Sequence, residues 1–271
     1  MPDPTKKIVL AYSGGLDTAV ILHWLVSRGH QVATFTADLG QAEDMEVLQR
    51  RAHEIGAAKV YVQDLREEFV TDFIFPAVQA NAVYEGTYLL GTSLARPLTA
   101  QAQANVALRD GADALAHGST GKGNDQVRFE FTYHALAPEV EIIAPWRDPE
   151  FLARFQGRPD LLRYAKRHGI PVKATRRKPW SSDPNLMHIS YEAGELEDPQ
   201  RRPRESMFQM TRSPRRAPNR ETELTIAFDR GIPVRVANPQ DGTMQESPLA
   251  LFGYLNQVGG IIGIGRVDMV E

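Results

Sequence analysis

The sequence predicts an α/β protein in which a parallel, doubly wound β-sheet is followed by a second α+β region. Two observations predict this fold. Over residues 8–144, short apolar runs alternate with segments of helical periodicity, and such alternation is typical of a parallel sheet with helices on both faces. After about residue 165 the alternation is lost, and Pro and Arg become frequent. We therefore expect two domains, at residues 1–165 and 166–271.

The elements of the first domain follow from periodicity and from end signals. An apolar run predicts a strand at 8–12, and a helical pattern at 16–28 is ended by Gly29. A strand at 31–37 precedes an amphipathic helix at 43–55, which has acids in its first turn and Gly56 after its last residue. The same criteria predict strands at 59–62, 113–116 and 141–144 and helices at 66–78, 98–109 and 124–136.

The second region carries fewer signals. Alternating residues predict strands at 223–228 and 233–237, followed by an Asp241-Gly242 turn. Ser247-Pro248 is typical of a helix start, and that helix should run to residue 257. Residues 261–271 read as a turn and a strand. Because the sequence stops inside this strand-like run, we expect 166–271 to be the first part of a longer domain.

Composition excludes several classes of function. The 271 residues include no cysteine, so disulfides, thiolate metal sites and a catalytic thiol are excluded. No apolar run approaches the length of a membrane span, and the one near the N-terminus is too short for a signal peptide. A net charge of −3 does not suggest a nucleic-acid partner. We therefore expect a cytoplasmic protein that binds neither membrane nor nucleic acid.

The histidines and the arginine-rich segment do not indicate a metal site or an RNA-binding site. The seven histidines show no metal-ligand spacing. Residues 201–220 hold seven arginines against the single acid Glu205, with Phe208 as the only aromatic residue. This pattern favours a solvated loop or a subunit contact over an RNA-binding patch.

The turn between the first strand and the first helix is rich in glycine. It reads Ser13-Gly14-Gly15-Leu16-Asp17-Thr18 and presents backbone N–H groups and the positive end of a helix dipole to an anion. Ser13 and Thr18 add hydroxyl donors, and Asp17 can hold a cation or orient water. The turn lacks the Lys and hydroxyl that end an ATPase P-loop. The alternative is a purely structural turn with Asp17 or Thr18 as a cap.

A second glycine-rich segment follows the strand predicted at 113–116. Residues 117–128 read HGSTGKGNDQVR and open a helix, so they should lie at the same sheet edge as Ser13. Asp125 can pair with an ammonium group and Arg128 can bind a carboxylate, a combination that suits a zwitterionic amino acid. A flexible loop with Asn124 as helix cap is the alternative.

Two further segments carry polar side chains of mixed type. Residues 84–97 place two tyrosines, several hydroxyls and Arg96 around Gly91, although a loop capped by Ser93 would look the same. Ser181, Asp183 and the segment 188–192 form the other group. Taken alone, these residues could equally be ordinary loop and strand hydroxyls.

Together these segments closely resemble the argininosuccinate synthase family. The first loop resembles the pyrophosphate-binding loop of the N-type ATP pyrophosphatases, a Rossmann-like fold class whose members cleave ATP between its α and β phosphates. The resemblance covers nearly the whole chain and rests on AYSGGLDT (11–18), FTAD (35–38), LLGTS (89–93), TGKGNDQVRFE (120–130), APWR (144–147), KPWS (178–181), HISYE (188–192), LEDP (196–199) and GRVD (265–268).

The resemblance implies that citrulline, aspartate and ATP become argininosuccinate, AMP and pyrophosphate through a citrullyl-adenylate, with Mg²⁺ carried by ATP. It assigns no acid or base. The ATP contacts that it implies are Ala11, Tyr12, Ser13, Gly14, Gly15, Leu16, Asp17, Thr18, Ala19, Ala37 and Gly118. The implied citrulline contacts are Tyr88, Ser93, Asn124, Arg128, Ser181, Ser190 and Glu271. The implied aspartate contacts are Thr120, Asn124 and Asp125.

Two departures from the family qualify this expectation. Many members have Ser where this chain has Ala19, and members continue well beyond residue 271 into the rest of the synthetase domain and a C-terminal helix used in tetramer assembly. We therefore expect the 271-residue chain alone to bind ATP weakly and to have little or no ligase activity.

Other functions compete for the same first loop. A nucleotide-binding module without catalysis would fit that loop but would leave the segments around Tyr88 and Thr120 unexplained. Enzymes that thiolate tRNA or use glutamine share the loop class, but they commonly need a catalytic cysteine, which this chain lacks.

Overall fold

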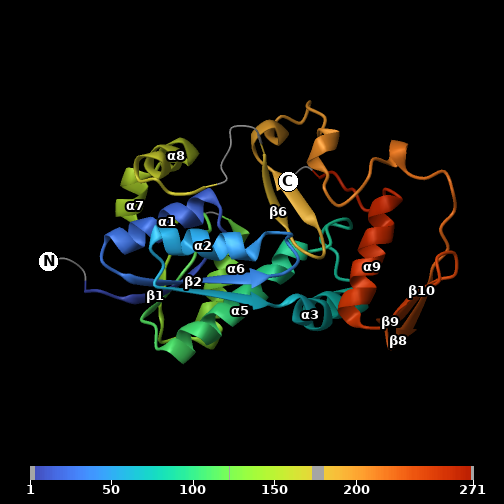
Figure 1. The fold of residues 1–271 in the computed structure, drawn as a ribbon, viewed down its shortest axis with the longest axis horizontal. Coiled ribbons are helices and arrows are strands. Elements are labelled where there is room, and N and C mark those ends of the chain that lie inside the picture. The colour runs from blue at the N-terminus through green and yellow to red at the C-terminus, as the bar shows by residue number, and fades with distance from the viewer. Residues whose placement is uncertain (1–3, 122, 173–179, 270–271) are drawn as a thin grey trace. The chain divides into compact units, whose positions relative to one another are not determined.

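A five-stranded parallel sheet organises the first part of the chain (Figure 1). The structure, a computed structural model, describes residues 4–121, 123–172 and 180–269. It separates into two units, of which the first comprises Met1–Asp38, Glu43–Asp64 and Ala95–Arg176, and the second comprises Leu39–Ala42, Leu65–Leu94 and Arg177–Glu271. The sheet lies in the first unit in the order β3-β2-β1-β4-β5. Its strands are β1 (Lys7–Ala11), β2 (Gln31–Asp38), β3 (Lys59–Asp64), β4 (Ala114–Ala116) and β5 (Glu141–Ile143).

The central strands are apolar because both faces of the sheet are covered. Ile8 and Val9 of β1 are each 1% exposed, and Leu10 is completely buried. All four strand pairs are parallel, as expected for a sheet of nearly continuous apolar runs. The parallel sheet predicted from the alternating pattern is therefore confirmed.

Helices pack on both faces of this sheet, as Figure 1 shows for α1 and α5. On one face, α1, α2 and α8 share a hydrophobic cluster with the strands and with Phe151 of α7. On the other face, the buried Gln103 of α5 donates from Nε2 to the carbonyl oxygens of Val9 and Ala116, at 2.8 and 3.0 Å. Tyr133 of α6 donates to Oε1 of Gln103. These helices are α1 (Leu16–Ser27), α2 (Met45–Ile55), α5 (Gly91–Asp110), α6 (Asn124–Leu136), α7 (Pro149–Arg154) and α8 (Arg158–Arg167), with a 3₁₀ turn at η2 (Pro145–Arg147).

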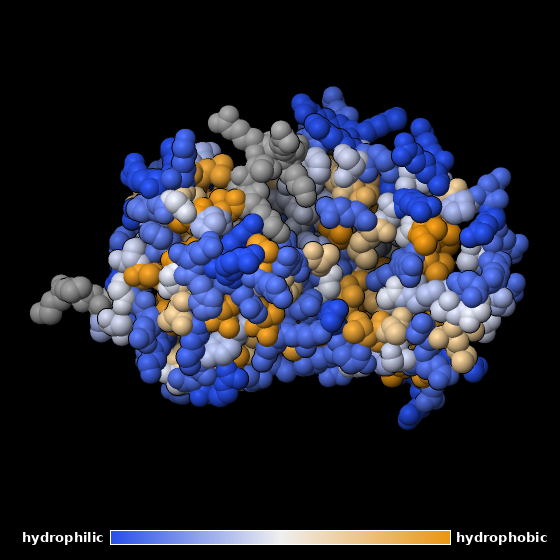
Figure 2. All heavy atoms as spheres, viewed as in Figure 1, coloured by the Kyte–Doolittle hydropathy of each residue, from blue (hydrophilic) through white to orange (hydrophobic). Residues whose placement is uncertain are grey.

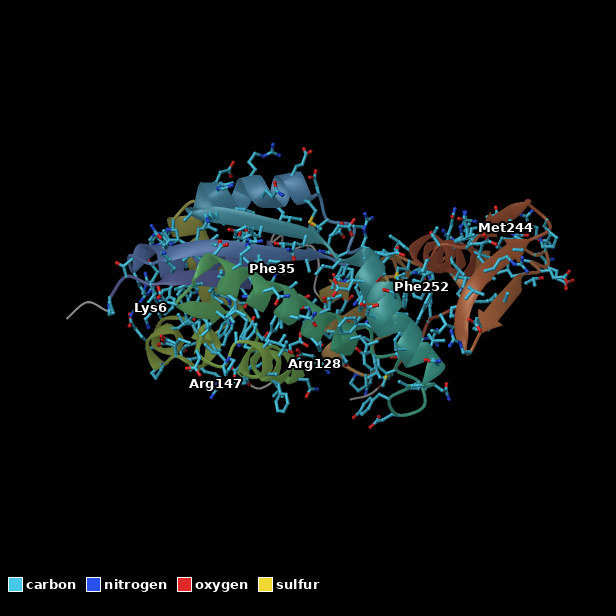
Figure 3. The ribbon with its side chains drawn as sticks, turned by 90° about the horizontal axis from the view of Figure 1, so that it is seen from below. Lys6, Phe35, Arg128, Arg147, Met244 and Phe252 are labelled. Carbon is cyan, nitrogen blue, oxygen red and sulfur yellow. The ribbon has the colours of Figure 1, made fainter. Side chains whose placement is uncertain are left out.

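The second unit contains two small antiparallel sheets and α9 (Pro248–Ile261). Val236 of β9 and Leu251 of α9 are both fully buried, and the Phe252 ring of α9 lies 6.5 Å from that of Phe75. Figure 3 labels Phe252 on α9 and Met244 on the neighbouring sheet. The sheets are formed by β6 (Ser181–Pro184) with β7 (Ile189–Glu192), and by β8 (Thr225–Asp229), β9 (Ile232–Asn238) and β10 (Thr243–Gln245); 3₁₀ turns occur at η3 (Gly194–Glu197), η4 (Glu205–Met207) and η5 (Pro214–Arg216).

One helical segment of the second unit is wider than an α-helix. It begins as α3 (Arg66–Glu68), continues as the π-helical η1 (Phe69–Ile74) and ends as α4 (Phe75–Gln79). The sequence predicted a helix at 66–78, and the structure confirms its position but not its uniform type. π-Helical turns occur mostly as short interruptions of α-helices.

Two expectations need correction, and two helices were not expected. The helix predicted at 98–109 begins at Gly91, so Ser93 lies inside its first turn instead of capping it, and Pro97 is accommodated within α5. Helices α7 and α8 were not predicted from the sequence. The strand predicted within 261–271 is absent from its described part, because residues 264–269 have no regular structure. The domain boundary at residue 165 stays a prediction.

The described surface is mixed in character. Hydrophilic residues dominate the face shown in Figure 2, and hydrophobic residues form small patches on it. Large apolar side chains that remain exposed include Phe131 of α6, at 77%, and Met244 of β10, at 59%. Within the described ranges, no helix combines the length and the apolar character that crossing a membrane would require.

Candidate functional site

The order of the strands places two loops at a topological switch point. β1 leads into α1 on one face of the sheet, whereas β4 leads into α6, which packs with α5 on the other face. The loops after these adjacent strands therefore diverge, and open α/β sheets bind ligands at this position. Both glycine-rich segments predicted from the sequence lie here: residues 13–18 and, of the second segment, the described residues 117–121 and 123–124.

The first loop has the backbone geometry of an anion site. Gly14 has a φ of 71°, a left-handed conformation that suits glycine. Gly15 is the N-cap residue of α1 and supplies no side chain to the first-turn N–H groups. Ser13 and Gly15 are exposed. The hydroxyls of Ser13 and Thr18 lie 3.2 Å apart, and the Ser13 hydroxyl also accepts from the N–H of Gly15 at 3.4 Å. The loop thus places hydroxyls and the first N–H groups of α1 at one helix N-terminus, a position that suits an anion.

The second loop lies directly against the first. A Cβ atom added to Gly118 would be 2.9 Å from Cγ2 of Thr18 and 3.4 Å from Cδ1 of Ile21. Only a residue without a side chain fits this contact undisturbed. The structure thus brings Gly118 to the start of α1, beside the predicted phosphate loop.

Two titratable side chains of the first loop are shifted by burial. Tyr12 is 3% exposed, and burial raises its pKa to about 12, against the opposing effect of Arg51. Its hydroxyl has no hydrogen-bond partner among the described residues. Burial also raises the pKa of Asp17, against the opposing charge of Arg158. Because burial penalises the charged carboxylate, Asp17 would gain from a nearby cation.

A network of side chains that runs from the buried His117 to the exposed Arg147 supports the second loop. His117 is fully buried; its Nδ1 accepts from the N–H of Ser119 at 3.3 Å, and its Nε2 lies 3.3 Å from Oε1 of Glu130. Arg147 donates to both oxygens of Glu130, at 3.0 and 3.1 Å. Burial lowers the pKa of His117, while Glu130 opposes that shift. The neutral ring, with its proton on Nε2, fits these contacts.

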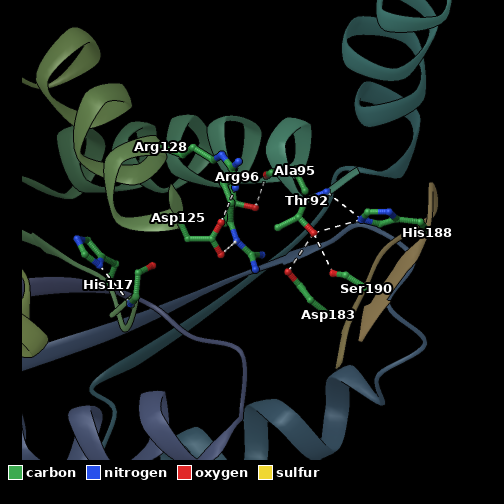
Figure 4. Close-up of polar contacts among 11 residues, drawn as sticks. Thr92, Ala95, Arg96, His117, Asp125, Arg128, Asp183, His188 and Ser190 are labelled. Atoms are coloured by element: carbon green, nitrogen blue, oxygen red, sulfur yellow. Dashed lines mark hydrogen bonds and ion pairs between the residues drawn. The ribbon is translucent and has the colours of Figure 1, made fainter. Parts of the chain in front are cut away.

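Asp125 lies between two arginines at the start of α6 (Figure 4). Arg96 donates from Nε to Oδ2 of Asp125, and Arg128 donates from a terminal nitrogen to Oδ1, both at 2.8 Å. The three side chains are 24–31% exposed. The sequence assigned Asp125 to an ammonium group and Arg128 to a carboxylate, and the structure shows the two side chains paired with each other.

A hydroxyl and imidazole cluster surrounds Thr92 in the second unit (Figure 4). The Thr92 hydroxyl lies 3.3 Å from Oδ2 of Asp183, 3.2 Å from Nε2 of His188 and 3.5 Å from the Ser190 hydroxyl. Asp183 of β6 pairs directly with Ser190 of β7. Through its contacts with Asp183 and Ser190, Thr92 joins both strands of the hairpin to the first turn of α5.

The other predicted site residues fall into three groups. Exposed or half-exposed positions at the loops include Thr120 and Asn124. Ala11, Leu16, Ala19 and Ala37 have fully or nearly buried side chains. These residues could contact a ligand only through their backbone atoms. Glu271 lies outside the described residues. The predicted citrulline contacts divide between the units: Asn124 and Arg128 are in the first, and Tyr88, Ser93, Ser181 and Ser190 are in the second.

Sequence reasoning missed several supporting side chains. Glu130 and Arg147 are far apart in sequence, and no spacing rule joins them. His188 and Thr92 were included only as parts of longer motifs. Within the described ranges, no group of three or more His, Asp or Glu residues is placed to hold a metal ion.

Comparison with known proteins identifies the family. The model described as "Arginosuccinate synthase N-terminal HUP domain" matches residues 7–171, and that described as "Arginosuccinate synthase C-terminal domain" matches residues 180–271. The chain belongs to the argininosuccinate synthase family. The resemblance seen in the sequence motifs is thereby confirmed.

Several members of the argininosuccinate synthase family are similar to this chain over most of its length. "Argininosuccinate synthase" of Thermotoga petrophila is 57% identical over 266 residues, which are 98% of this chain and 65% of that protein. The proteins of the same name from Danio rerio and Bos taurus are each 54% identical, over 97% and 98% of this chain and 64% of their own length. The chain thus spans somewhat less than two thirds of the relatives that it matches.

One solved structure gives a weaker match. It is described as "The crystal structure of predicted subunit of tRNA methyltransferase from Methanocaldococcus jannaschii DSM". Its TM-score is 0.40 at 15% identity, over 60% of this chain and 76% of that one. This likeness is too weak to bear on fold or function.

Proposed function

We propose that this chain carries the nucleotide site and part of the amino-acid site of an AMP-forming ligase, which joins citrulline and aspartate into argininosuccinate and releases AMP and pyrophosphate. The observation that carries the proposal is the Ser13–Thr18 loop, with its left-handed Gly14, at the N-terminus of α1 beside Gly118. Such a loop at a switch point suits a polyphosphate. Membership of the family supports the choice of amino-acid substrates.

The first loop would hold the departing pyrophosphate. Its exposed N–H groups and the hydroxyls of Ser13 and Thr18 are donors at the position where charge develops as the bond to the α-phosphate breaks. Mg²⁺ would enter with ATP and neutralise part of this charge. The oxygen donors fit such an ion, and Asp17, whose carboxylate is destabilised by burial, is the residue that would gain most from it.

The polar clusters would hold the two amino acids. In the proposed reaction, the ureido oxygen of citrulline attacks the α-phosphate, pyrophosphate leaves, and the amine of aspartate then attacks the ureido carbon and displaces AMP. The amine loses a proton in this step. Because the ureido oxygen is a weak nucleophile, positioning should supply much of the rate.

The charges of the site suit zwitterionic ligands. Asp125 is available to an ammonium group, and Arg128 to a carboxylate, once ligands compete with the ion pairs that Asp125 makes with Arg96 and Arg128. The hydroxyls of Ser190 and Thr92 are suitable partners for a neutral ureido group. In line with the family resemblance, we further propose that the protein acts in the cytoplasm as part of a homotetramer.

A comparison of two glycine substitutions tests the nucleotide site. Gly14→Val and Gly29→Val both place a branched residue at a left-handed φ, of 71° and 88°. Gly29 lies at the far end of α1 and meets nothing within 4 Å, so it controls for backbone strain. We expect Gly14→Val to abolish ATP binding in calorimetric titration and Gly29→Val to preserve it. Equal affinity in both variants would show that the phosphates bind elsewhere.

Product analysis tests the reaction. Pyrophosphate and AMP release should be measured with ATP, citrulline and aspartate, for this chain beside the longer Thermotoga petrophila relative. ADP and phosphate as products would exclude the mechanism. If the chain binds a non-hydrolysable ATP analogue but neither amino acid, the alternative of a nucleotide-binding module replaces the ligase proposal.

A further inference from the structure

His188, the residue just before β7, caps the first turn of α5. Thr92 is the second residue of α5, so its backbone N–H has no partner within the helix. This N–H donates to Nε2 of His188 at 3.1 Å. Because a backbone nitrogen can only donate, Nε2 must be the unprotonated nitrogen, and the neutral ring carries its proton on Nδ1.

The same ring fixes the residues that lead into the helix. A Cβ atom on Gly91 would lie 2.5 Å from Cδ2 of His188, so the ring rests directly on the backbone of Gly91. The ring of Tyr88 packs against it, with centroids 5.3 Å apart and planes tilted by 42°. One imidazole therefore holds both the start of α5 and the orientation of Tyr88.

The chain entering α5 needs such support. Leu90 has a φ of 64° and Glu85 a φ of 50°, left-handed conformations that L residues rarely adopt. Strained residues of this kind persist only where their surroundings fix them. On either side of Glu85, Tyr84 and Tyr88 exchange backbone hydrogen bonds of 2.8 and 2.9 Å, and His188 holds the end of the segment next to Leu90.

We propose that His188, in its neutral form, is a positioning residue for citrulline, which acts by fixing Tyr88 and the N-terminus of α5 through its Nε2 acceptor. This inference rests on the proposed function and on the citrulline contacts Tyr88, Ser93 and Ser190 that the family resemblance implies. His188 itself need not touch the substrate.

The arrangement makes the positioning sensitive to pH. Tyr88 and Thr92 contact the ring directly. The Asp183 carboxylate on β6 and the Ser190 hydroxyl on β7 contact the Thr92 hydroxyl, and Asp183 acts on the ring through its charge. Burial lowers the pKa of His188, and Asp183 opposes that shift. A protonated ring has donors on both nitrogens and cannot accept from the Thr92 N–H. As the pH falls through the pKa of the folded state, the cap and the fixed position of Tyr88 should therefore be lost.

Two amide substitutions distinguish the role of His188 as a hydrogen-bond acceptor from a role in filling space. The side-chain oxygen of Gln reaches the position of Nε2, whereas that of Asn reaches only the position of Nδ1. We expect His188→Gln to keep citrulline affinity, measured by calorimetry with α,β-methylene-ATP present, and His188→Asn to lose about 10- to 100-fold. When the pH is lowered from about 8 to about 5.5, wild type should lose citrulline affinity, and His188→Gln should lose much less of it. His134→Gln, at an exposed position on α6, is the control.

A readout without substrate distinguishes this inference from the proposed function. Hydrogen exchange at the Thr92 amide should be fast in His188→Asn and slow in wild type and His188→Gln. Unchanged exchange in His188→Asn would overturn the inference, as would equal citrulline affinity in all variants. If the exchange result holds but wild type binds no citrulline, the substrate in the proposed function is wrong, and His188 still fixes α5.

Discussion

The contact between Gly118 and α1 predicts a specific cost for one added methyl group. In Gly118→Ala, the new Cβ atom would lie 2.9 Å from Cγ2 of Thr18, closer than van der Waals contact allows. Thr18 cannot easily turn away, because it is β-branched and its hydroxyl already lies 3.2 Å from that of Ser13. The first turn of α1 or the loop after β4 must therefore move.

The expected loss in the free energy of unfolding is the cost of overpacking minus the gain from replacing a glycine. Overpacking of this kind costs about 1–3 kcal/mol. Replacing Gly by Ala returns about 0.4–1 kcal/mol by restricting the unfolded chain, since Gly118 lies outside the left-handed region. The net loss should be roughly 0.5–2 kcal/mol, which lowers Tm by about 1–8 °C in a protein of this size. The nucleotide loop should move with α1, so ATP affinity should also fall.

Two partner variants make this prediction refutable. Gly253→Ala changes a glycine inside α9 that meets nothing within 4 Å and should raise stability, because Gly is a poor helix former. Thr18→Ser removes the clashing methyl but keeps the hydroxyl, so the double variant with Gly118→Ala should recover most of the loss. Urea unfolding followed by circular dichroism measures all four. If Gly118→Ala is as stable as wild type, or its loss simply adds to that of Thr18→Ser, the packing argument is wrong.

Three further predictions concern other described contacts. Asp125→Ala should weaken aspartate binding about 10- to 100-fold with ATP affinity unchanged in calorimetry, and an equal loss for both ligands would contradict the assignment. Gln103→Leu removes the buried amide that donates to two strand carbonyls and accepts from Tyr133 and should lower the free energy of unfolding by about 2–4 kcal/mol in urea; a loss below about 0.5 kcal/mol would refute this. Burial, His168 and Arg154 all lower the pKa of His23, so stability should fall as the pH drops below the unfolded-state value, near 6.5, through the folded-state value. His23→Gln should flatten this part of the pH–stability curve, and an unchanged slope would exclude His23 as its source.

The parallel sheet could be predicted because its signals are local. Each strand is a short apolar run, and α2 has both a capping Asp44 and a left-handed Gly56 at its ends. The start of α5 could not be predicted, because Pro97 suggested a helix beginning after it. In the structure Pro97 is the seventh residue of α5, and the carbonyl that it leaves without a donor belongs to the first turn.

The residues of the candidate site also divide into those with local sequence signals and those without. Residues in contiguous motifs, such as Ser13, Thr18 and Asp125, were identified from spacing alone. Glu130 and His188 act on loops that are distant in sequence, through contacts that exist only after folding. Periodicity and motif spacing contain no information about such contacts, so the sequence motifs included both residues but only the structure shows what they contact.

The π-helical turn in the 66–79 segment has a consequence for how the length of this protein can vary. The buried pairs Phe69-Val70 and Ile74-Phe75 are five residues apart, one more than an α-helical turn needs to align two side chains. Removal of one residue between them, such as the exposed Asp72, would restore α-helical spacing and leave both pairs facing inward. This turn is thus a place where a one-residue deletion, ordinarily disruptive within a helix, should be accepted during divergence of the sequence.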